Sequence, residues 1–168
     1  MPQLQHRIQP CLWFSGQAEQ AARFYTSVFP QSHLGDLSYY AEAGQDQHGQ
    51  PPGSVMSVSF EVLGQPMLAL NGGPIFQFTE ALSLMVLCDT QDEVDHYWNA
   101  LSQGGDPAAQ QCGWLKDRYG VSWQITPAVF AQWITSPDRA AVERYMSAMM
   151  TMKKLDLARL RRAFEGSE

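Results

Sequence analysis

The feature that most restricts the fold of this chain is an order of strands and helices that occurs twice. In the first half, an apolar strand over residues 8–14 precedes a helical segment over 15–30. A short strand near 37–40 then leads to two further strands, VMSVSFEV and MLALN, which the turn LGQP joins. Alternating apolar positions predict strands and a 3.6-residue spacing predicts a helix, so this half is predicted to be βαβββ.

The second half repeats the order. It contains a strand at 82–88, a helix at 90–104, a possible short strand at 108–111 and a hairpin at 112–125. The two helical segments superpose at a shift of 74 residues, which aligns Gln17 with Gln91. Because an internal duplication sets the architecture, we expect an α+β fold of paired βαβββ modules.

The expected organisation is one domain of 168 residues, a length sufficient to bury a core. Module one covers about 6–73, module two about 80–127, and C-terminal helices about 128–165.

Local signals predict the ends of the two repeated helices. Ser15 is the expected N-cap of the first helix, and Pro30 ends it. Thr90 and Glu93 fit a capping box at the start of the second helix, and Gly104 fits its C-terminal cap.

The C-terminal segment is predicted to be helical and amphipathic. A second start signal lies at 136–138, after the apolar residues of 129–133. The apolar positions beyond it are Met146, Met149, Met150, Met152, Leu155, Leu157 and Leu160. Methionine fills irregular gaps in cores, so we interpret this pattern as core or dimer packing in preference to a binding groove.

Composition and charge exclude several classes of function. The net charge is −6, and the one concentration of basic residues lies in the predicted C-terminal helix, so we expect no nucleic-acid partner. No apolar run approaches the roughly 20 residues that span a bilayer, and the N-terminus lacks a signal-peptide pattern. We therefore expect a cytoplasmic protein with no membrane partner. Its three cysteines have no CxxC spacing and are expected to be reduced, without a disulfide framework or a structural zinc site.

The hairpin CGWLKDRYGVSWQI carries a specific register prediction. If DRYG forms a type I turn with Gly120 as the bulge residue, Trp114 pairs with Gln124 and Lys116 with Ser122. Cross-strand partners share a face, so these four side chains would lie opposite the apolar face of the hairpin. A slip of one residue would exchange Trp114 for Leu115.

Four stretches of the sequence closely resemble the PhnB-like branch of the vicinal oxygen chelate superfamily. They are PCLWFSGQAEQAARFYTSVFP, LALNGGPIFQFTEALSLMVLCDTQDEVDHYW, CGWLKDRYGVSWQI and AMMTMKKLDLARL. The superfamily includes glyoxalase I, bleomycin-resistance proteins and extradiol dioxygenases, and the branch often carries the label 3-demethylubiquinone-9 3-methyltransferase. The resemblance implies two modules whose curved mixed sheet encloses a ligand cavity, and a homodimer.

The resemblance also implies where a divalent metal would bind. Metal-using members take one ligand from the first strand and one from the last strand of each module, and these positions fall here on Gln9, Ala69, Ser83 and Gln124. None is a carboxylate, imidazole or thiolate, and neutral amides alone bind divalent metals weakly. His6 is the nearest substitute ligand, but it lies three residues before Gln9 and would therefore be on the opposite face of that strand. We therefore expect no metal and no other cofactor.

The predicted cavity combines apolar walls with a few polar groups. Strand alternation assigns to it one face of each strand, including Met67 with Asn71 and Ser83 with Met85 and Leu87. The predicted ligand-binding residues are Gln9, Cys11, Trp13, Asn71, Ser83, Cys112, Trp114 and Gln124. Asn71 or a bound ligand is the expected partner of the Gln124 amide, because an unpartnered buried amide is costly.

Two hypotheses of function follow. In the first, the protein binds a small, largely uncharged organic molecule without a metal. In the second, it is a lyase, isomerase, dioxygenase-type enzyme or the labelled methyltransferase, with Cys11 or Cys112 as nucleophile or with a metal held by unexpected side chains. No glycine-rich loop between a strand and a helix supports a nucleotide cofactor for methyl transfer. Catalytic residues cannot be assigned from the sequence.

Overall fold

A computed structural model describes residues 8–167 of the chain. The chain divides into two compact units, Met1–Phe78 and Thr79–Glu168. The boundary falls between the two predicted modules, and the C-terminal helices belong to the second unit. His6 lies outside the described residues, and the prediction of a single domain stays a prediction.

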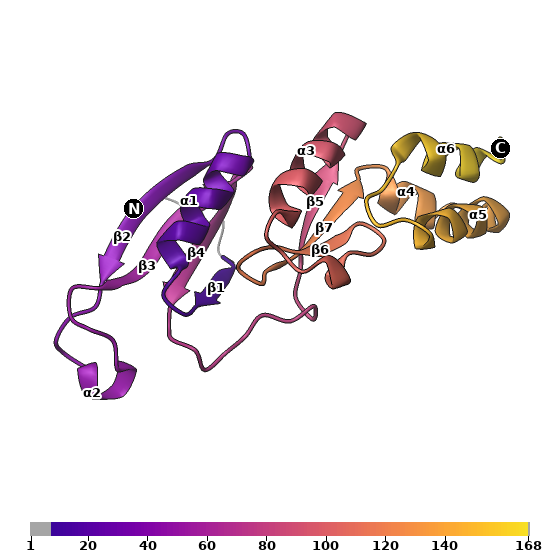
Figure 1. The fold of residues 1–168 in the computed structure, drawn as a ribbon. Coiled ribbons are helices and arrows are strands. Elements are labelled where there is room, and N and C mark those ends of the chain that lie inside the picture. Colours follow the sequence, from indigo (N-terminus) through magenta and orange to yellow (C-terminus); the bar gives the residue numbers. More distant parts are fainter. Residues whose placement is uncertain (1–7, 168) are drawn as a thin grey trace. The chain divides into compact units, whose positions relative to one another are not determined.

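The first unit has the predicted βαβββ order around a mixed sheet (Figure 1). Strand order in the sheet is β1-β4-β3-β2, with β1 parallel to β4 and the other neighbours antiparallel. Its elements are β1 (Cys11–Phe14), α1 (Ala18–Val28), β2 (His33–Tyr39), α2 (Gln45–His48), β3 (Val55–Val62) and β4 (Gln65–Asn71). The predicted hairpin at LGQP is confirmed, because β3 and β4 pair up to Val62 and Gln65. The short helix α2 within the polar loop was not predicted.

The prediction that Ser15 caps helix α1 is wrong. Gln17 is the N-cap and makes no side-chain capping bond. Instead the Ala18 N–H donates to Oδ1 of Asn71, 2.9 Å away at the end of β4. A helix start leaves N–H groups without partners inside the helix, and a side chain from a distant strand satisfies one here.

The face predicted for Met67, Ala69 and Asn71 is also wrong. In the parallel pair, Leu12 lies opposite Ala69 and Cys11 lies opposite Leu68. Cross-strand partners share a face, and the Leu12–Ala69 face is fully buried, which matches the buried side of α1. Asn71 therefore lies with Met67 and Ala69 on the covered face of the sheet, and the open face carries Cys11 and Leu68.

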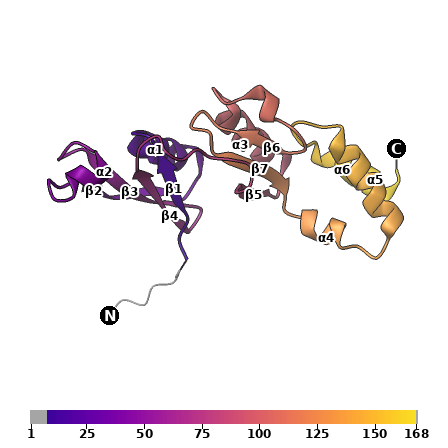
Figure 2. The ribbon, with the colours of Figure 1, turned by 90° about the horizontal axis from the view of Figure 1, so that it is seen from below.

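The second unit repeats the strand–helix–hairpin order and adds three helices (Figure 2). Its sheet has the order β5-β7-β6, with β5 parallel to β7. Its elements are β5 (Leu84–Cys88), α3 (Gln91–Ser102), the 3₁₀ helix η1 (Pro107–Ala109), β6 (Trp114–Lys116), β7 (Ser122–Pro127), α4 (Phe130–Ile134), α5 (Arg139–Met150) and α6 (Leu157–Glu165). The capping box of Thr90 and Glu93 is confirmed at the start of α3.

The possible strand at 108–111 is wrong, because η1 occupies this place. Pro107 stands in its first turn, and the Asp106 side chain accepts a hydrogen bond from the Ala108 N–H. Proline lacks the N–H that a strand ladder needs, and an aspartate cap favours a turn. Only an isolated bridge between Gln111 and Trp114 remains in this part of the described chain.

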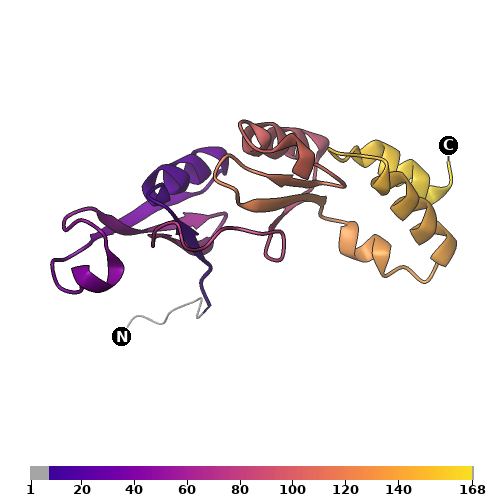
Figure 3. The ribbon, with the colours of Figure 1, turned by 60° about the horizontal axis from the view of Figure 1, so that its bottom comes forward.

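The C-terminal helices pack around a small core of their own. Helices α5 and α6 lie side by side (Figure 3), and a segment at 151–156 joins them. The buried cluster is Tyr145, Met149, Met152, Leu155 and Leu160. The predicted core role is thus confirmed for Met149, Met152, Leu155 and Leu160, whereas Met146 and Met150 are exposed. Within the described part of the chain, no helix combines the length and apolar character needed to cross a membrane.

Candidate functional site

The register of the β6–β7 hairpin is the predicted one. Trp114 pairs with Gln124, Leu115 with Trp123 and Lys116 with Ser122. This arrangement decides which side chains face α3 and which face away from it. The prediction that Trp114, and not Leu115, lies beside Gln124 is confirmed.

Asp117 holds this register from inside the turn. This residue is 3% exposed, and its Oδ1 accepts hydrogen bonds from the backbone N–H groups of Tyr119, at 2.8 Å, and Val121, at 3.0 Å. Its Oδ2 accepts a bond of 2.8 Å from Nε1 of Trp123. Gly120 has a φ of +86°, a left-handed conformation that glycine adopts without a steric penalty. The motif DRYGVSW thus fixes the hairpin through one buried carboxylate and one glycine.

The two faces of the second sheet differ in burial. Leu115, Val121, Trp123 and Ile125 are buried, and both hairpin strands contact α3. On the opposite face, Trp114 and Gln124 are half-buried. The predicted face of β5 is confirmed as well, since Met85 pairs with Gln124 and is exposed.

Gln124 has a partner within its own unit. Its Nε2 donates a hydrogen bond of 2.8 Å to Oγ of Ser83, just before β5. The expected partner was Asn71 or a ligand, but both polar ends of the Asn71 amide are engaged in the first unit, by Ala18 and by the Val55 carbonyl. The neighbouring Ser122 hydroxyl is buried and has no hydrogen-bond partner among the described residues.

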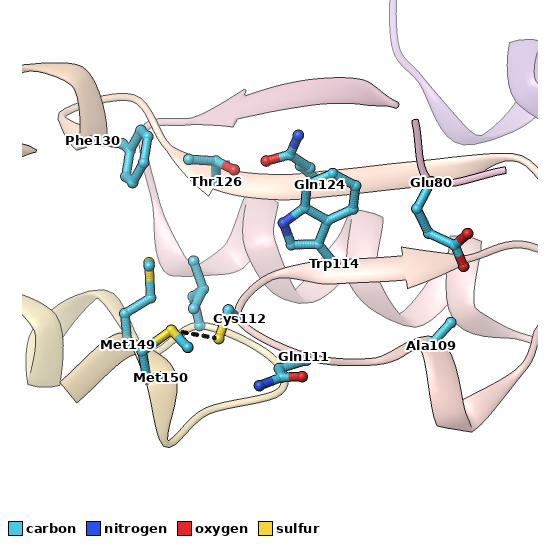
Figure 4. A pocket seen from close by; sticks show the side chains of 11 residues that line it. Glu80, Ala109, Gln111, Cys112, Trp114, Gln124, Thr126, Phe130, Met149 and Met150 are labelled. Carbon is cyan, nitrogen blue, oxygen red and sulfur yellow. Dashed lines mark hydrogen bonds between the residues drawn. The ribbon is translucent and has the colours of Figure 1, made fainter. Parts of the chain in front are cut away.

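A pocket of about 490 Å³ opens beside Gln124 in the second unit (Figure 4). It is lined by Glu80, Ala109, Gln111, Cys112, Trp114, Gln124, Thr126, Phe130, Met149, Met150 and Leu155. Three predicted ligand-binding residues, Cys112, Trp114 and Gln124, therefore meet at one pocket, and Ser83 anchors one of them. Sequence reasoning missed the contribution of the C-terminal helices. The methionine pattern was the available signal, but we interpreted it as packing.

Backbone hydrogen bonds fix the C-terminal wall of this pocket to the hairpin. The N–H groups of Cys112 and Gly113 donate to the carbonyls of Met152 and Lys153, each at 2.8 Å. A further contact joins this segment to α3, where the Gln91 side chain donates to the Leu155 carbonyl at 3.1 Å. The wall is therefore part of the folded unit.

Two helix-to-segment contacts strengthen this docking. Oε1 of Gln91 accepts a bond of 2.8 Å from the N–H of Leu157, the first residue of α6, so both ends of this amide bind the chain around the start of that helix. Lys154 Nζ lies 2.7 Å from Asp95 Oδ1, and this hydrogen bond lowers the pKa of the Asp95 carboxyl.

The charged groups next to the pocket neutralise each other. Lys116 Nζ lies 2.6 Å from Oε1 of Glu80, and this hydrogen bond lowers the pKa of the Glu80 carboxyl. Cys112 Sγ lies 3.5 Å from Sδ of Met150, as the dashed line in Figure 4 shows. The pocket thus combines a paired charge with apolar and sulfur-bearing walls.

Of the predicted site residues of the first unit, Cys11 and Trp13 lie on the open face of its sheet, whereas Asn71 lies on the covered face. Gln9 and Cys11 are exposed, and partial burial raises the pKa of the Cys11 thiol. Trp13 is half-buried, and its Nε1 donates a hydrogen bond of 2.8 Å to the Gly73 carbonyl. Ligand contacts by Gln9, Cys11 and Trp13 stay a prediction.

The positions implied for a divalent metal do not fit one. The shift of 74 residues that relates the two modules aligns Cys11 with Met85. Cys11 pairs with Leu68 in the first sheet, and Met85 pairs with Gln124 in the second, so Leu68 corresponds to Gln124. Leu68 therefore takes the place that we assigned to Ala69, and its hydrocarbon side chain offers no donor. Across residues 8–167, no group of three or more His, Cys, Asp or Glu side chains could hold a metal ion. An amide and a hydroxyl bonded to each other form a poor donor set for a divalent cation.

Comparison with known proteins agrees with this architecture. The fold and the repeated module place the chain in the vicinal oxygen chelate superfamily, in its PhnB-like branch. Residues 6–126 match the sequence profile of the 3-demethylubiquinone-9 3-methyltransferase family, and the chain belongs to that family. The matched segment ends within β7, so the helices α4, α5 and α6 lie beyond it.

Two solved structures illustrate the relationship. The PhnB protein of Bacillus cereus is 38% identical, with a TM-score of 0.62 over 73% of this chain and 100% of that chain. Protein PA1353 of Pseudomonas aeruginosa is 20% identical, with a TM-score of 0.55 over 73% of this chain and 97% of that chain, and it supports the fold alone. No match is found among curated proteins.

Proposed function

We propose that this protein binds a small, largely uncharged organic molecule in the pocket of its second unit, without a divalent metal. The observation that supports this proposal is the size and lining of the pocket. Ligand sites typically have volumes of roughly 300–1,000 Å³ and combine apolar walls with a few polar groups. Here Trp114, Phe130, Met149, Met150 and Leu155 form an apolar lining, and the pocket volume is about 490 Å³.

The polar groups at the pocket suit orientation of a neutral ligand. Gln111, Gln124 and Thr126 bring amides and a hydroxyl, and the carboxylate of Glu80 is paired with Lys116. A ligand with a full charge would find no unpaired opposite charge among these lining residues. Apolar surface would supply affinity, and the amides would select the pose.

An enzyme acting on a small molecule in the same pocket is the second candidate. The observation that favours it is the Cys112 thiol, which lines the pocket beside Met150. Methyl transfer, the reaction in the family's name, would require a methyl donor. The NGGP stretch after β4 leads into a loop and not into a helix, so it lacks the setting of a nucleotide-binding turn. Homodimer formation and a cytoplasmic location stay predictions.

Binding of the neutral dye Nile red to the full chain tests the pocket. We expect one dye per chain, with fluorescence enhancement on binding. Met150→Trp fills the pocket from α5 and should weaken binding at least tenfold. Met146→Trp is the matched control, because Met146 is also an exposed methionine of α5 but does not line the pocket, and it should bind like the parent.

Two results would contradict the proposal. Equal dye affinity for both tryptophan variants would show that the dye does not occupy this pocket. Elemental analysis of the purified protein tests the proposal that no divalent metal takes part. One tightly held divalent ion per chain would overturn it.

A further inference from the structure

We propose that Trp114 and Gln124 form a hydrogen-bonding pair that recognises a neutral hydroxyl group on an aromatic ring, so that the ligand class is a hydroxyarene. This inference rests on the proposed binding function of the pocket and specifies its ligand. Nε1–H of Trp114 would donate to the hydroxyl oxygen. Oε1 of Gln124 would accept the hydroxyl proton.

The two groups are neighbours because of the hairpin register. Trp114 and Gln124 are cross-strand partners on β6 and β7, and both line the pocket. Directly opposed residues have Cβ atoms roughly 4.5–5.5 Å apart, close enough for both side chains to contact one small group. Figure 4 shows the indole and the carboxamide next to each other, projecting from adjacent strands.

Each side chain has one polar atom left for a ligand. The amide nitrogen of Gln124 is engaged by Ser83, and no hydrogen bond from residues 8–167 reaches its Oε1. Nε1 of Trp114 likewise has no hydrogen-bond partner in the described chain, although neither atom is fully buried. Other tryptophans use this donor internally, since Trp13 bonds to the Gly73 carbonyl and Trp123 to Asp117.

The chemistry of this pair selects a hydroxyl. A hydroxyl both donates and accepts, so a single group can satisfy both protein atoms. An ether or ketone only accepts and would leave Oε1 of Gln124 without a donor. A carboxylate would bring its negative charge against the same oxygen, and an ammonium could not accept from the indole. A phenol-type hydroxyl stays neutral at pH 7, because its pKa is near 10.

The other lining residues favour an aromatic ring behind this hydroxyl. Phe130 and Leu155 offer apolar contacts, and Met149 and Met150 bring thioether sulfurs into the same pocket (Figure 4). Contacts between methionine sulfur and aromatic rings are favourable by about 0.3–1.5 kcal/mol. These residues all come from the part of the chain beyond the family match, so they would set the shape of the ligand while the hairpin recognises its hydroxyl.

Titration of the full chain at pH 7 with 2-naphthol, 2-methoxynaphthalene and naphthalene tests the pair. We expect 2-naphthol to bind roughly three- to tenfold more tightly than its methyl ether, the ratio for one neutral hydrogen bond. Gln124→Met should bring that ratio to about one. Trp114→Phe should weaken the naphthol and the ether by the same factor relative to naphthalene, because both accept from the indole.

Gln132→Met is the matched control, since it removes an exposed carboxamide from α4, the helix that begins with Phe130, but Gln132 does not line the pocket. It should leave the naphthol-to-ether ratio unchanged. A ratio that survives Gln124→Met overturns the inference, and so does equal binding of all three compounds to the parent protein. If Nile red binds but none of the three does, the ligand class is wrong and the proposed function stands. If neither Nile red nor any of the three binds, the proposed function itself fails.

Discussion

Replacement of Gly113 by alanine would test how tightly β7 and the segment before α6 pack around this glycine. Gly113 is buried, its N–H donates to the Lys153 carbonyl at 2.8 Å, and its carbonyl accepts from the Ile125 N–H at 2.8 Å. A Cβ at this position would lie 2.8 Å from the Ile125 carbonyl oxygen and 3.1 Å from Cδ1 of Leu155. Backbone and core side chain would both have to move.

The expected loss of unfolding free energy in Gly113→Ala has two parts. Gly113 has a φ of +84°, and a left-handed conformation costs a non-glycine residue about 1–2 kcal/mol. Overpacking against a fixed backbone adds about 1–3 kcal/mol. We therefore expect Gly113→Ala to lower the free energy of unfolding by about 2–5 kcal/mol.

Gly53→Ala separates the two parts. Gly53 has a similar φ of +79°, but an added Cβ would have nothing within 4 Å. This control should therefore lose only the conformational part, about 1–2 kcal/mol. Urea unfolding of the full chain, followed by tryptophan fluorescence and circular dichroism, measures both variants. An equal loss at the two positions would refute the reasoning, because it would mean that neither the Ile125 backbone nor the Leu155 side chain resists the added Cβ.

The remaining predictions concern buried polar groups. Asp117→Asn replaces the acceptor of the Trp123 indole by a donor, so it should lower the free energy of unfolding by about 1–3 kcal/mol, measured by thermal melting. Asp36→Asn, at an exposed aspartate, is the control and should lower it by less than about 0.5 kcal/mol. Similar losses in the two variants would contradict the role of the turn carboxylate. Burial raises the pKa of Cys88 from 9.0 to about 12 and that of Tyr145 from 10.0 to about 12. The folded state therefore keeps protons that the unfolded state loses, and stability should fall as the pH rises from about 9 to about 12. Cys88→Ala and Tyr145→Phe should each flatten this decline in urea midpoints, and an unchanged slope in both variants would refute it.

Tyr145→Phe has a further consequence at neutral pH. The Tyr145 hydroxyl is buried without a partner among the described residues, so its removal should leave stability unchanged or raise it. A large loss on calorimetry would show that this hydroxyl has a partner, such as a buried water.

Features encoded by neighbouring residues were predictable from the sequence. The capping box joins Thr90 to Glu93, and the DRYG turn sets the pairing of Trp114 with Gln124. These contacts span at most ten residues, so residue type and spacing are enough to specify them. The repeated order of strands and helices followed in the same way from alternation and helical period.

Features that join distant segments were not predictable. Asn71 caps α1 from 53 residues away, and the parallel pairing of β1 with β4 decides which face of β4 is covered. Alternation shows that Ala69 and Leu68 face opposite ways but not which of them faces the helix. A parallel ladder between distant strands is decided by how the sheet packs, and a shift of one residue exchanges the two faces.

The sequence by itself determined the modules, the hairpin and the presence of Trp114 beside Gln124. Only the tertiary structure decided that α5 and the segment after it form the second wall of the pocket. Met149 and Met150 are adjacent in the sequence and similar in chemistry, yet Met149 packs into the helical core and Met150 is 56% exposed beside Cys112. The hydrophobic effect favours burial of such side chains but is not directional, so the residues that bury each one depend on how the distant segments of the chain pack together.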